Sequence, residues 1–212
     1  MTNIIPGPAY RIETKHLVIR CWKPADAPLL KDAIDASMSH LLPFMPWAAA
    51  EPQPLQVKID LLRRFRSEFD SGRNYVHGIF NKDETRVVGG TGLHPRVGEL
   101  AHEIGYWIHV DFVRQGFATE VSAALTRVAF EVDHVERVEI HCDPANTYSA
   151  AVPRKLGYTF DGKLRSRLRQ ADGSWRDTLV FSMLAEEFTA SSAQTIAADI
   201  RALDAAGRPI IG

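Results

Sequence analysis

The sequence predicts an α/β (α+β) fold, a mixed but mostly antiparallel sheet of seven strands flanked by helices. Two observations lead to this prediction. Runs of β-branched, aromatic and aliphatic residues bounded by turn residues alternate with segments whose apolar residues recur every three to four positions. Their order is strand, two helices, three strands, helix, strand, helix and two strands, so one helix must cross between the fourth and fifth strands.

The first strand and the first two helices open the chain. Leu17–Trp22 is predicted to be a strand, and Asp26 is placed to cap a helix over residues 29–40. Two prolines in the segment 41–47 end this helix and make the segment irregular. Apolar residues return at helical spacing from 54 to 69, which predicts a second helix with one face on the sheet.

The later strands are expected wherever β-branched and aromatic residues cluster between turn residues. They cover residues 75–80, 86–93, 102–110, 137–142, 158–168 and 175–184. The last two flank the turn 171–174, which is typical of a hairpin. A helix beginning at Asn146 ends before Gly157, a residue that suits a helix C-terminus.

Composition limits the kinds of protein to consider. A chain of 212 residues suits one domain, and its net charge of −1 shows neither a nucleic-acid footprint nor a polybasic membrane surface. Cys21 and Cys142 lie far apart without a CxxC, and we expect no signal peptide and no membrane span, so the cytoplasm is the simplest location. The eight histidines are dispersed without an HxxxH pattern, so no metal site is expected.

The stretch 110–130 passes from a strand, through a turn of small residues, into an amphipathic helix. Gly116 and Ala118 leave backbone N–H groups uncovered, and Thr119 adds a hydroxyl. The helix start contributes unpaired N–H groups and the positive end of its dipole, so an anionic ligand such as a phosphate fits here. The alternative is an ordinary strand-to-helix connection in which Gly116 only permits a tight turn.

Four short motifs follow one another along the chain. They are Ile104-Gly-Tyr-Trp-Ile108, Val113-Arg-Gln-Gly-Phe-Ala-Thr-Glu120, Asn146-Thr-Tyr-Ser149 and Lys155-Leu-Gly-Tyr158. In this order and spacing they resemble the GNAT superfamily of N-acetyltransferases, and are most similar to the RimJ/RimL-type ribosomal-protein-alanine N-acetyltransferases. The resemblance covers residues 10–188, taken as the GNAT domain. Residues 189–212 are left as a C-terminal tail, helical over 195–206, which could be an oligomer contact in a homodimer.

The resemblance implies a splayed sheet, in which the fourth and fifth strands part and the pantetheine arm of acetyl-CoA lies between them. It implies cofactor contacts along the fourth strand, the turn and two helix starts, at Trp107, Ile108, Val110, Arg114, Gln115, Gly116, Phe117, Ala118, Thr119, Asn146 and Ser149. Val113 departs from the family pattern, which begins with Gln or Arg three residues before Gly116. We therefore expect backbone N–H groups to hold the diphosphate. Capping of a helix is the alternative role for Asn146.

Acetyl transfer to an amine needs a neutral amine, a polarised carbonyl and a hydrogen bond to the departing thiolate. Glu103 is expected to accept the proton of the amine through water; the alternative is a solvated charge at a strand edge. A backbone N–H near Trp107 or Ile108 would polarise the carbonyl. Because Pro153 stands where many family members have a tyrosine, Ser149 is expected to hydrogen-bond the sulfur, as the resemblance to RimL-like enzymes implies.

The segment 41–47 is expected to border the acceptor. The candidate acceptor contacts are Phe44, Trp47, His94 and Glu103. His94 and His77 could both line the acceptor cleft, and the alternative for each is a place on the surface of a strand. Phe44 and Trp47 could instead plug the core between two helices.

Two further groups of residues have competing interpretations. Arg165, Arg167 and Arg169 alternate on one strand, where they would either attract an acidic group or discourage strand pairing. His141 and Cys142 are adjacent on a strand and point to opposite faces, which argues against a nucleophilic cysteine activated by His141.

Together these observations predict an acetyl-CoA-dependent N-acetyltransferase that acetylates a primary amine directly. The leading acceptor is the N-terminal amine of a protein or peptide. The alternative among enzymes is a small-molecule amine, such as an aminoacyl-nucleotide, an amino acid or an antibiotic. A module that binds acyl-CoA without catalysis is the alternative outside enzymes.

Overall fold

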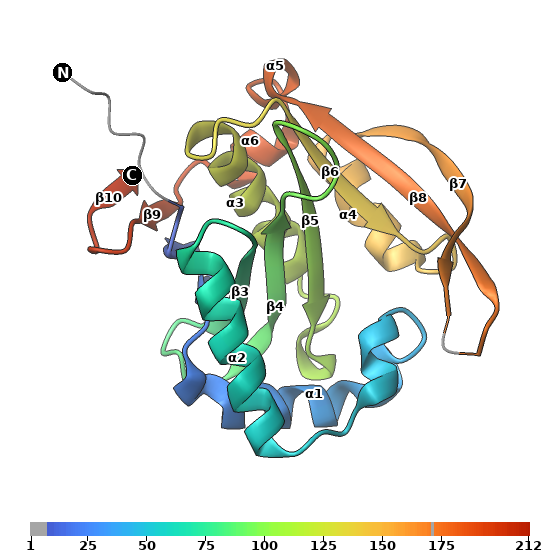
Figure 1. The fold of residues 1–212 in the computed structure, drawn as a ribbon. Helices are drawn as coiled ribbons and strands as arrows, with labels where there is room; N and C mark the ends of the chain where they lie inside the picture. The colour runs from blue at the N-terminus through green and yellow to red at the C-terminus, as the bar shows by residue number, and fades with distance from the viewer. Residues whose placement is uncertain (1–7, 171) are drawn as a thin grey trace.

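Ten strands form one sheet within residues 8–170 and 172–212, the part of the chain that the computed structural model describes (Figure 1). Their order across the sheet is β10-β9-β1-β2-β3-β4-β5-β6-β8-β7. The strands are β1 (Arg11–Glu13), β2 (Leu17–Cys21), β3 (Tyr75–Asn81), β4 (Val87–His94), β5 (Ala101–Ile108), β6 (Arg137–Cys142), β7 (Thr159–Arg169), β8 (Trp175–Leu184), β9 (Arg201–Leu203) and β10 (Pro209–Ile211). The expected fold class is confirmed, but the number of strands is wrong. The three additional strands have only three residues each, too few to show a period of two.

The strands pair antiparallel with one exception among the described residues: β5 and β6 are parallel. The helix α3 (Phe117–Glu131) joins these two strands, as a parallel connection requires. The crossing helix between the fourth and fifth predicted strands is therefore confirmed.

Helices cover the two faces of the sheet. The helices α1 (Ala27–Leu41) and α2 (Leu55–Asp70) pack on one face, and α3 and α4 (Thr147–Leu156) pack on the other (Figure 1). The neighbours Val18 and Ile19 on β2 illustrate the alternation, because they belong to separate cores on opposite faces. No helix in the described part of the chain is both long and apolar enough to cross a bilayer.

The segment 189–212 continues the fold. It contains α6 (Ser192–Ile196), preceded by the short α5 (Ala185–Phe188), and then β9 and β10 instead of the helix expected over 195–206. The strand β9 pairs with β1, and Ala193, Ala202 and Ile211 are buried in the core that α3 lines. The helical expectation holds for Thr195 and Ile196 at the end of α6 and fails beyond them, because β1 offers β9 a hydrogen-bonded edge, a contact distant in sequence. Ala171, in the expected turn 171–174, lies outside the described residues.

Candidate active site

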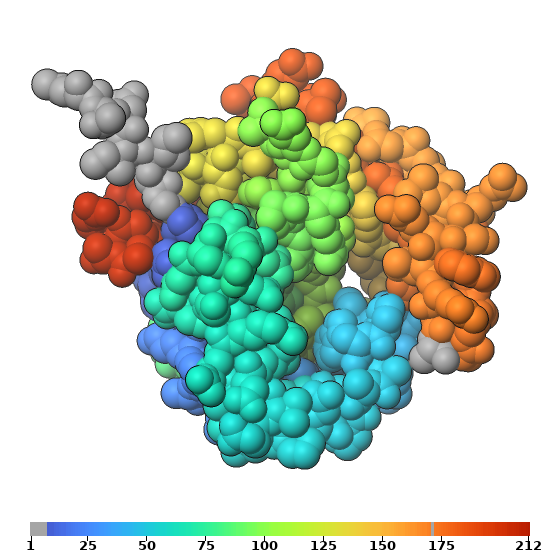
Figure 2. Space-filling model, viewed as in Figure 1, coloured from blue at the N-terminus to red at the C-terminus, as the bar shows by residue number. Residues whose placement is uncertain are grey.

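The sheet opens between β5 and β6. These strands pair only from Ala101↔Arg137 to Ile104↔Ile140, and beyond that point β5 runs on to Ile108 while β6 pairs with β8 up to Cys142. Figure 1 shows β5 and β6 side by side at one end and parted at the other, and Figure 2 shows a hollow between β5, the segment after α1 and the β7–β8 hairpin. The predicted splay of the sheet is confirmed, and it leaves one edge of β5 without a strand partner beyond Ile104.

Every second backbone N–H group of β5 points toward this opening. His109 donates its N–H to the carbonyl of Val88 at 2.8 Å, so the N–H of Trp107 also points toward β4, and that of Ile108 points into the opening. Of the two expected donors to a thioester carbonyl, Ile108 is therefore the one placed for the task. The N–H of Val110 donates to Ser37 Oγ at 3.1 Å, so this N–H is not free for a cofactor.

The start of α3 presents free donors to solvent. Gly116 is its N-cap residue with a φ of 85°, a conformation that favours glycine, and no side chain caps the helix there. Within the described residues, the backbone N–H groups of Phe117, Ala118 and Thr119 find no acceptor. Arg114, Gln115 and Gly116 are exposed beside them, although Gln115 already donates its side chain to the carbonyl of Asp111 at 3.0 Å. A diphosphate can therefore reach several backbone donors at this turn.

The start of α4 lies across the opening from β5. Asn146 Oδ1 accepts the N–H of Ser149 at 3.0 Å, so Asn146 caps the helix as expected. Tyr106 on β5 places its hydroxyl 3.0 Å from Ser149 Oγ and 3.3 Å from the carbonyl oxygen of Ser149. Burial raises the pKa of Tyr106 well above its ordinary value, so its hydroxyl stays protonated at neutral pH. Sequence reasoning did not foresee this contact, because alternation alone does not say whether Tyr106 or Trp107 faces α4.

Glu103 lies at the closed end of the opening. Its side chain is largely buried, and both oxygens accept from Arg96, at 2.8 Å from Nε and 2.7 Å from Nη2. Burial alone would raise the pKa of Glu103, but the hydrogen bonds and charge of Arg96 outweigh it and lower this pKa. Glu103 is therefore an ionised, held carboxylate, unlike the solvated strand-edge charge considered above.

Two more ionisable residues surround Glu103 on the same face. Glu139 is its register partner on β6, and His141 lies two residues further along β6. His141 Nε2 is 2.6 Å from Glu139 Oε2, and its Nδ1 is 3.7 Å from Glu103 Oε2. From the sequence, His141 was considered only as a partner of Cys142 and Glu139 was not singled out, because the parallel register that aligns β5 with β6 is a tertiary property.

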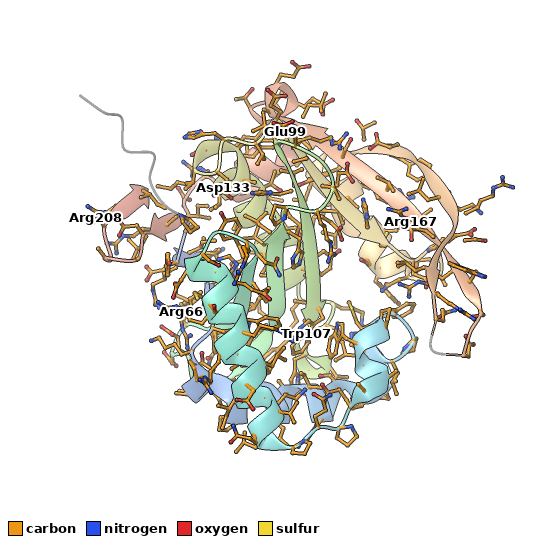
Figure 3. The ribbon with its side chains drawn as sticks, viewed as in Figure 1. Arg66, Glu99, Trp107, Asp133, Arg167 and Arg208 are labelled. Atoms are coloured by element: carbon orange, nitrogen blue, oxygen red, sulfur yellow. The ribbon has the colours of Figure 1, made fainter. Side chains whose placement is uncertain are left out.

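The expected acceptor residues border the opening on its other sides. Trp47 packs edge-on against Trp107, with ring centroids 6.1 Å apart, and its side chain is 40% exposed. Figure 3 labels Trp107 on β5 and Arg167 on the hairpin side of the opening. The carbonyl of Phe44 accepts from Arg176 Nη1 on β8 at 3.1 Å, which ties the segment after α1 to the hairpin.

The two candidate histidines differ in position. His94 lines a pocket of about 330 Å³ with Glu68, Arg73, Asn74, Pro95 and Arg96. Burial lowers the pKa of His94 to about 4, and its Nδ1 lies 2.7 Å from Asn74 Oδ1. His77 is fully buried, with its ring nitrogens at the carbonyls of Tyr75 and Ala9, so it does not line a cleft.

The structure decides two questions that the sequence raised about β6 and β7. The sequence predicted that Arg165, Arg167 and Arg169 share one face of a strand. Ser166 adopts a φ of 51° where the β7–β8 register shifts, so these three arginines do not form one uninterrupted row. Cys142 is buried, and burial raises its pKa to about 11, which disfavours a thiolate, while the ring of His141 engages Glu139 instead. Among the described residues no group of three His, Cys, Asp or Glu is arranged to hold a metal ion.

Comparison with known families matches residues 16–159 to the acetyltransferase (GNAT) domain. Since this is more than half of the chain, the protein belongs to the GNAT family and is an acetyl-transferring enzyme. It is similar to the uS5-alanine N-acetyltransferase of Escherichia coli K12, at 25% identity over 187 residues, covering 86% of this chain and 94% of that protein. The resemblance to ribosomal-protein N-acetyltransferases is confirmed at this modest identity.

Solved structures of the family share the fold. RimL, the ribosomal L7/L12 acetyltransferase solved with coenzyme A, aligns with a TM-score of 0.72 at 19% identity, covering 81% of this chain and 95% of that one. The microcin C7 self-immunity acetyltransferase MccE, solved with acetyl-CoA and AMP, aligns with a TM-score of 0.74 at 18% identity, covering 81% of this chain and 93% of that one. At these identities the two structures establish the fold alone.

Proposed function

We propose that this protein transfers the acetyl group of acetyl-CoA directly to a primary amine, and that the N-terminal amine of a protein is its leading acceptor. The observation that supports this most is the opening between β5 and β6, which ends at one side on free helix donors and at the other on a buried carboxylate. The similarity to an enzyme that acetylates ribosomal protein uS5 supports the choice of acceptor.

The donor substrate would lie along the opening. Its diphosphate would accept hydrogen bonds from the N–H groups of 116–119, and its pantetheine arm would pass Trp107 and the start of α4 at Asn146. The N–H of Ile108 would donate to the thioester carbonyl, where negative charge develops during attack. No metal is needed for these steps.

The acceptor would enter from the face that carries Glu103. Its ammonium would lose a proton to Glu103 through water, and the neutral amine would attack the carbonyl carbon. The carbon–sulfur bond then breaks, one of the two protons left on the attacking nitrogen passes to the departing thiolate, and Ser149 would donate a hydrogen bond to that sulfur. Phe44, Trp47 and His94 would border the residues that follow the amine.

Thiol release with acetyl-CoA tests this function. We would measure it with peptides that begin with Ala or Ser, and with aminoacyl-nucleotides, amino acids and aminoglycosides as small amines. Glu103→Gln and Ser149→Ala should each lower kcat for the preferred amine by at least about tenfold. Retained binding of CoA without thiol release from any amine would instead indicate a binding module, and unchanged rates in both variants would refute the catalytic assignment.

A further inference from the structure

His141 connects the two glutamates of adjoining strands. Its Nε2 lies 2.6 Å from Glu139 Oε2, and its Nδ1 faces Glu103 Oε2 at 3.7 Å. Glu139 is in turn held by Arg137, 2.9 Å from Oε1, and Glu103 by Arg96. The imidazole thus lies between two carboxylates, each of which has its own arginine.

This arrangement sets the tautomer of the imidazole. A carboxylate only accepts hydrogen bonds, so the short contact to Glu139 places the hydrogen of neutral His141 on Nε2. The lone pair is then on Nδ1, the nitrogen that faces Glu103. A histidine oriented by one carboxylate, with its other nitrogen free, is an arrangement that accepts protons well.

We infer that His141 takes the acceptor's proton from Glu103 and passes it to solvent, with Glu139 as the positioning residue that orients its ring. This inference rests on the proposed function. An ammonium and a thioester give an amide, a thiol and one released proton. The N–H bond of the ammonium breaks, and a water molecule passes the proton to Glu103 Oε2. The proton then moves from Glu103 Oε2 to His141 Nδ1.

Glu103 by itself is a poor store for this proton. Arg96 occupies both of its oxygens and lowers its pKa, so a proton on Glu103 is readily passed on. The separation of 3.7 Å is beyond direct hydrogen bonding and within reach of a small side-chain rotation. Glu139 stabilises the positive imidazolium that results.

A route to solvent leads away from His141. The residue lines a pocket of about 420 Å³ between β6 and the hairpin, and its side chain is 21% exposed. Glu103 on β5 and Glu139 on β6 face the ring, and the other charged residues that line this pocket with His141 are Arg96 before β5 and Asp161 and Arg167 on β7. The pocket therefore adjoins the imidazole, and no residue of α3 lines it.

The test compares His141→Asn with His134→Asn, a substitution of an exposed histidine between α3 and β6. With one acceptor amine, His141→Asn should lower kcat by about 100-fold, whereas His134→Asn should leave it unchanged. The pH profile of kcat/KM should also differ between the parent protein and His141→Asn, and should be the same in His134→Asn as in the parent protein.

Chemical rescue separates proton transfer from structure. Added imidazole should raise the rate of the His141→Ala protein by at least about tenfold and should leave the rate of the parent protein unchanged. A His141→Asn protein with the parent's rate and pH profile, or a folded His141→Ala protein that imidazole does not rescue, would overturn the relay. Neither result would contradict the proposed acetyltransferase function. That function would be contradicted only if the parent protein released no thiol with any amine.

Discussion

Tyr106 and Ser149 meet across the opening in the sheet, with the Tyr106 hydroxyl 3.0 Å from Ser149 Oγ. The contact joins β5, which carries the expected acyl site, to the first turn of α4. Since the Tyr106 hydroxyl stays protonated, it can donate to Ser149 and leave the serine hydroxyl free to donate to sulfur. Many family members have a tyrosine where this chain has Pro153 on α4, and here a tyrosine hydroxyl reaches the start of α4 from β5 instead.

The contact between Tyr106 and Ser149 predicts effects of different size for the two residues. Ser149→Ala should lower kcat by about tenfold and leave the KM for acetyl-CoA nearly unchanged, because the hydrogen bond forms only as the thiolate departs. Tyr106→Phe should have a smaller effect, since Ser149 keeps its own hydroxyl. Steady-state thiol release measures both, and a larger loss in Tyr106→Phe would assign the donor role to the tyrosine.

Replacing Arg96 should change the acidity of Glu103. Arg96 lowers the pKa of Glu103 and burial opposes it, so in Arg96→Ala this pKa should rise. The activity attributed to ionised Glu103 should then be lost at a higher pH on acidification than in the parent protein. Arg96→Lys, which keeps the charge but not the two-pronged contact, is the matched control. Carbon NMR of the Glu103 carboxyl reads the pKa directly, and an unchanged value would contradict the argument.

The same pair should contribute to the pH dependence of folding. Because the pKa of Glu103 is lowered in the folded protein, its ion pair stabilises the fold above the ordinary glutamate pKa. That contribution should disappear as the pH falls through the lowered value. Urea unfolding at neutral and acidic pH should show a stability difference between parent and Glu103→Gln that shrinks on acidification, and a constant difference would argue against the pair.

Gly116 should be needed for CoA binding more than for folding. A Cβ added at Gly116 would meet no protein atom within 4 Å, so the protein itself leaves room for a side chain there. Gly116→Val should nevertheless weaken CoA binding by about tenfold or more, because it disfavours the positive φ and covers the donors of α3. Gly116→Asn, which tolerates this φ, isolates the effect of coverage. Calorimetry with CoA measures both, and unchanged affinity in both variants would refute the diphosphate site.

A buried ion pair fixes the residues between the segment 41–47 and α2 to that helix. Lys58 is fully buried and contacts Glu51, whose side chain is 5% exposed. Lys58→Met should lower the free energy of unfolding by about 3 kcal/mol, because it leaves the buried carboxylate of Glu51 without its counter-ion, although the N–H of Gln53 still donates to it. The double variant Lys58→Met/Glu51→Gln should recover part of this loss. Urea denaturation tests the pair, and equal stabilities for all three proteins would show that the pair contributes nothing.

Features that depend on neighbouring residues could be predicted from the sequence. The seven longer strands, the cap at Asn146 and the turn at Gly116 are set by side-chain periodicity and backbone conformation within a few residues. The order of these elements was enough to predict the helix that crosses between β5 and β6. The family motifs lie in the same local segments, which is why the resemblance could be identified from them.

Other features required the folded chain. The three-residue strands β1, β9 and β10 exist because partners from both ends of the chain complete their hydrogen bonds. The sequence predicted that Arg165, Arg167 and Arg169 lie on one face of their strand, and the bulge at Ser166 interrupts that row.

The sequence by itself determined the class of enzyme and the turn that suits a diphosphate, because backbone donors at a helix start depend on local structure. Only the tertiary structure decided which charged residues surround Glu103. Arg96, Glu103, Glu139 and His141 come from a loop and two strands, and a one-residue slip of β6 against β5 would send Glu139 and His141 to the opposite face. The strand register therefore determines the charged group at which the proposed proton transfer takes place.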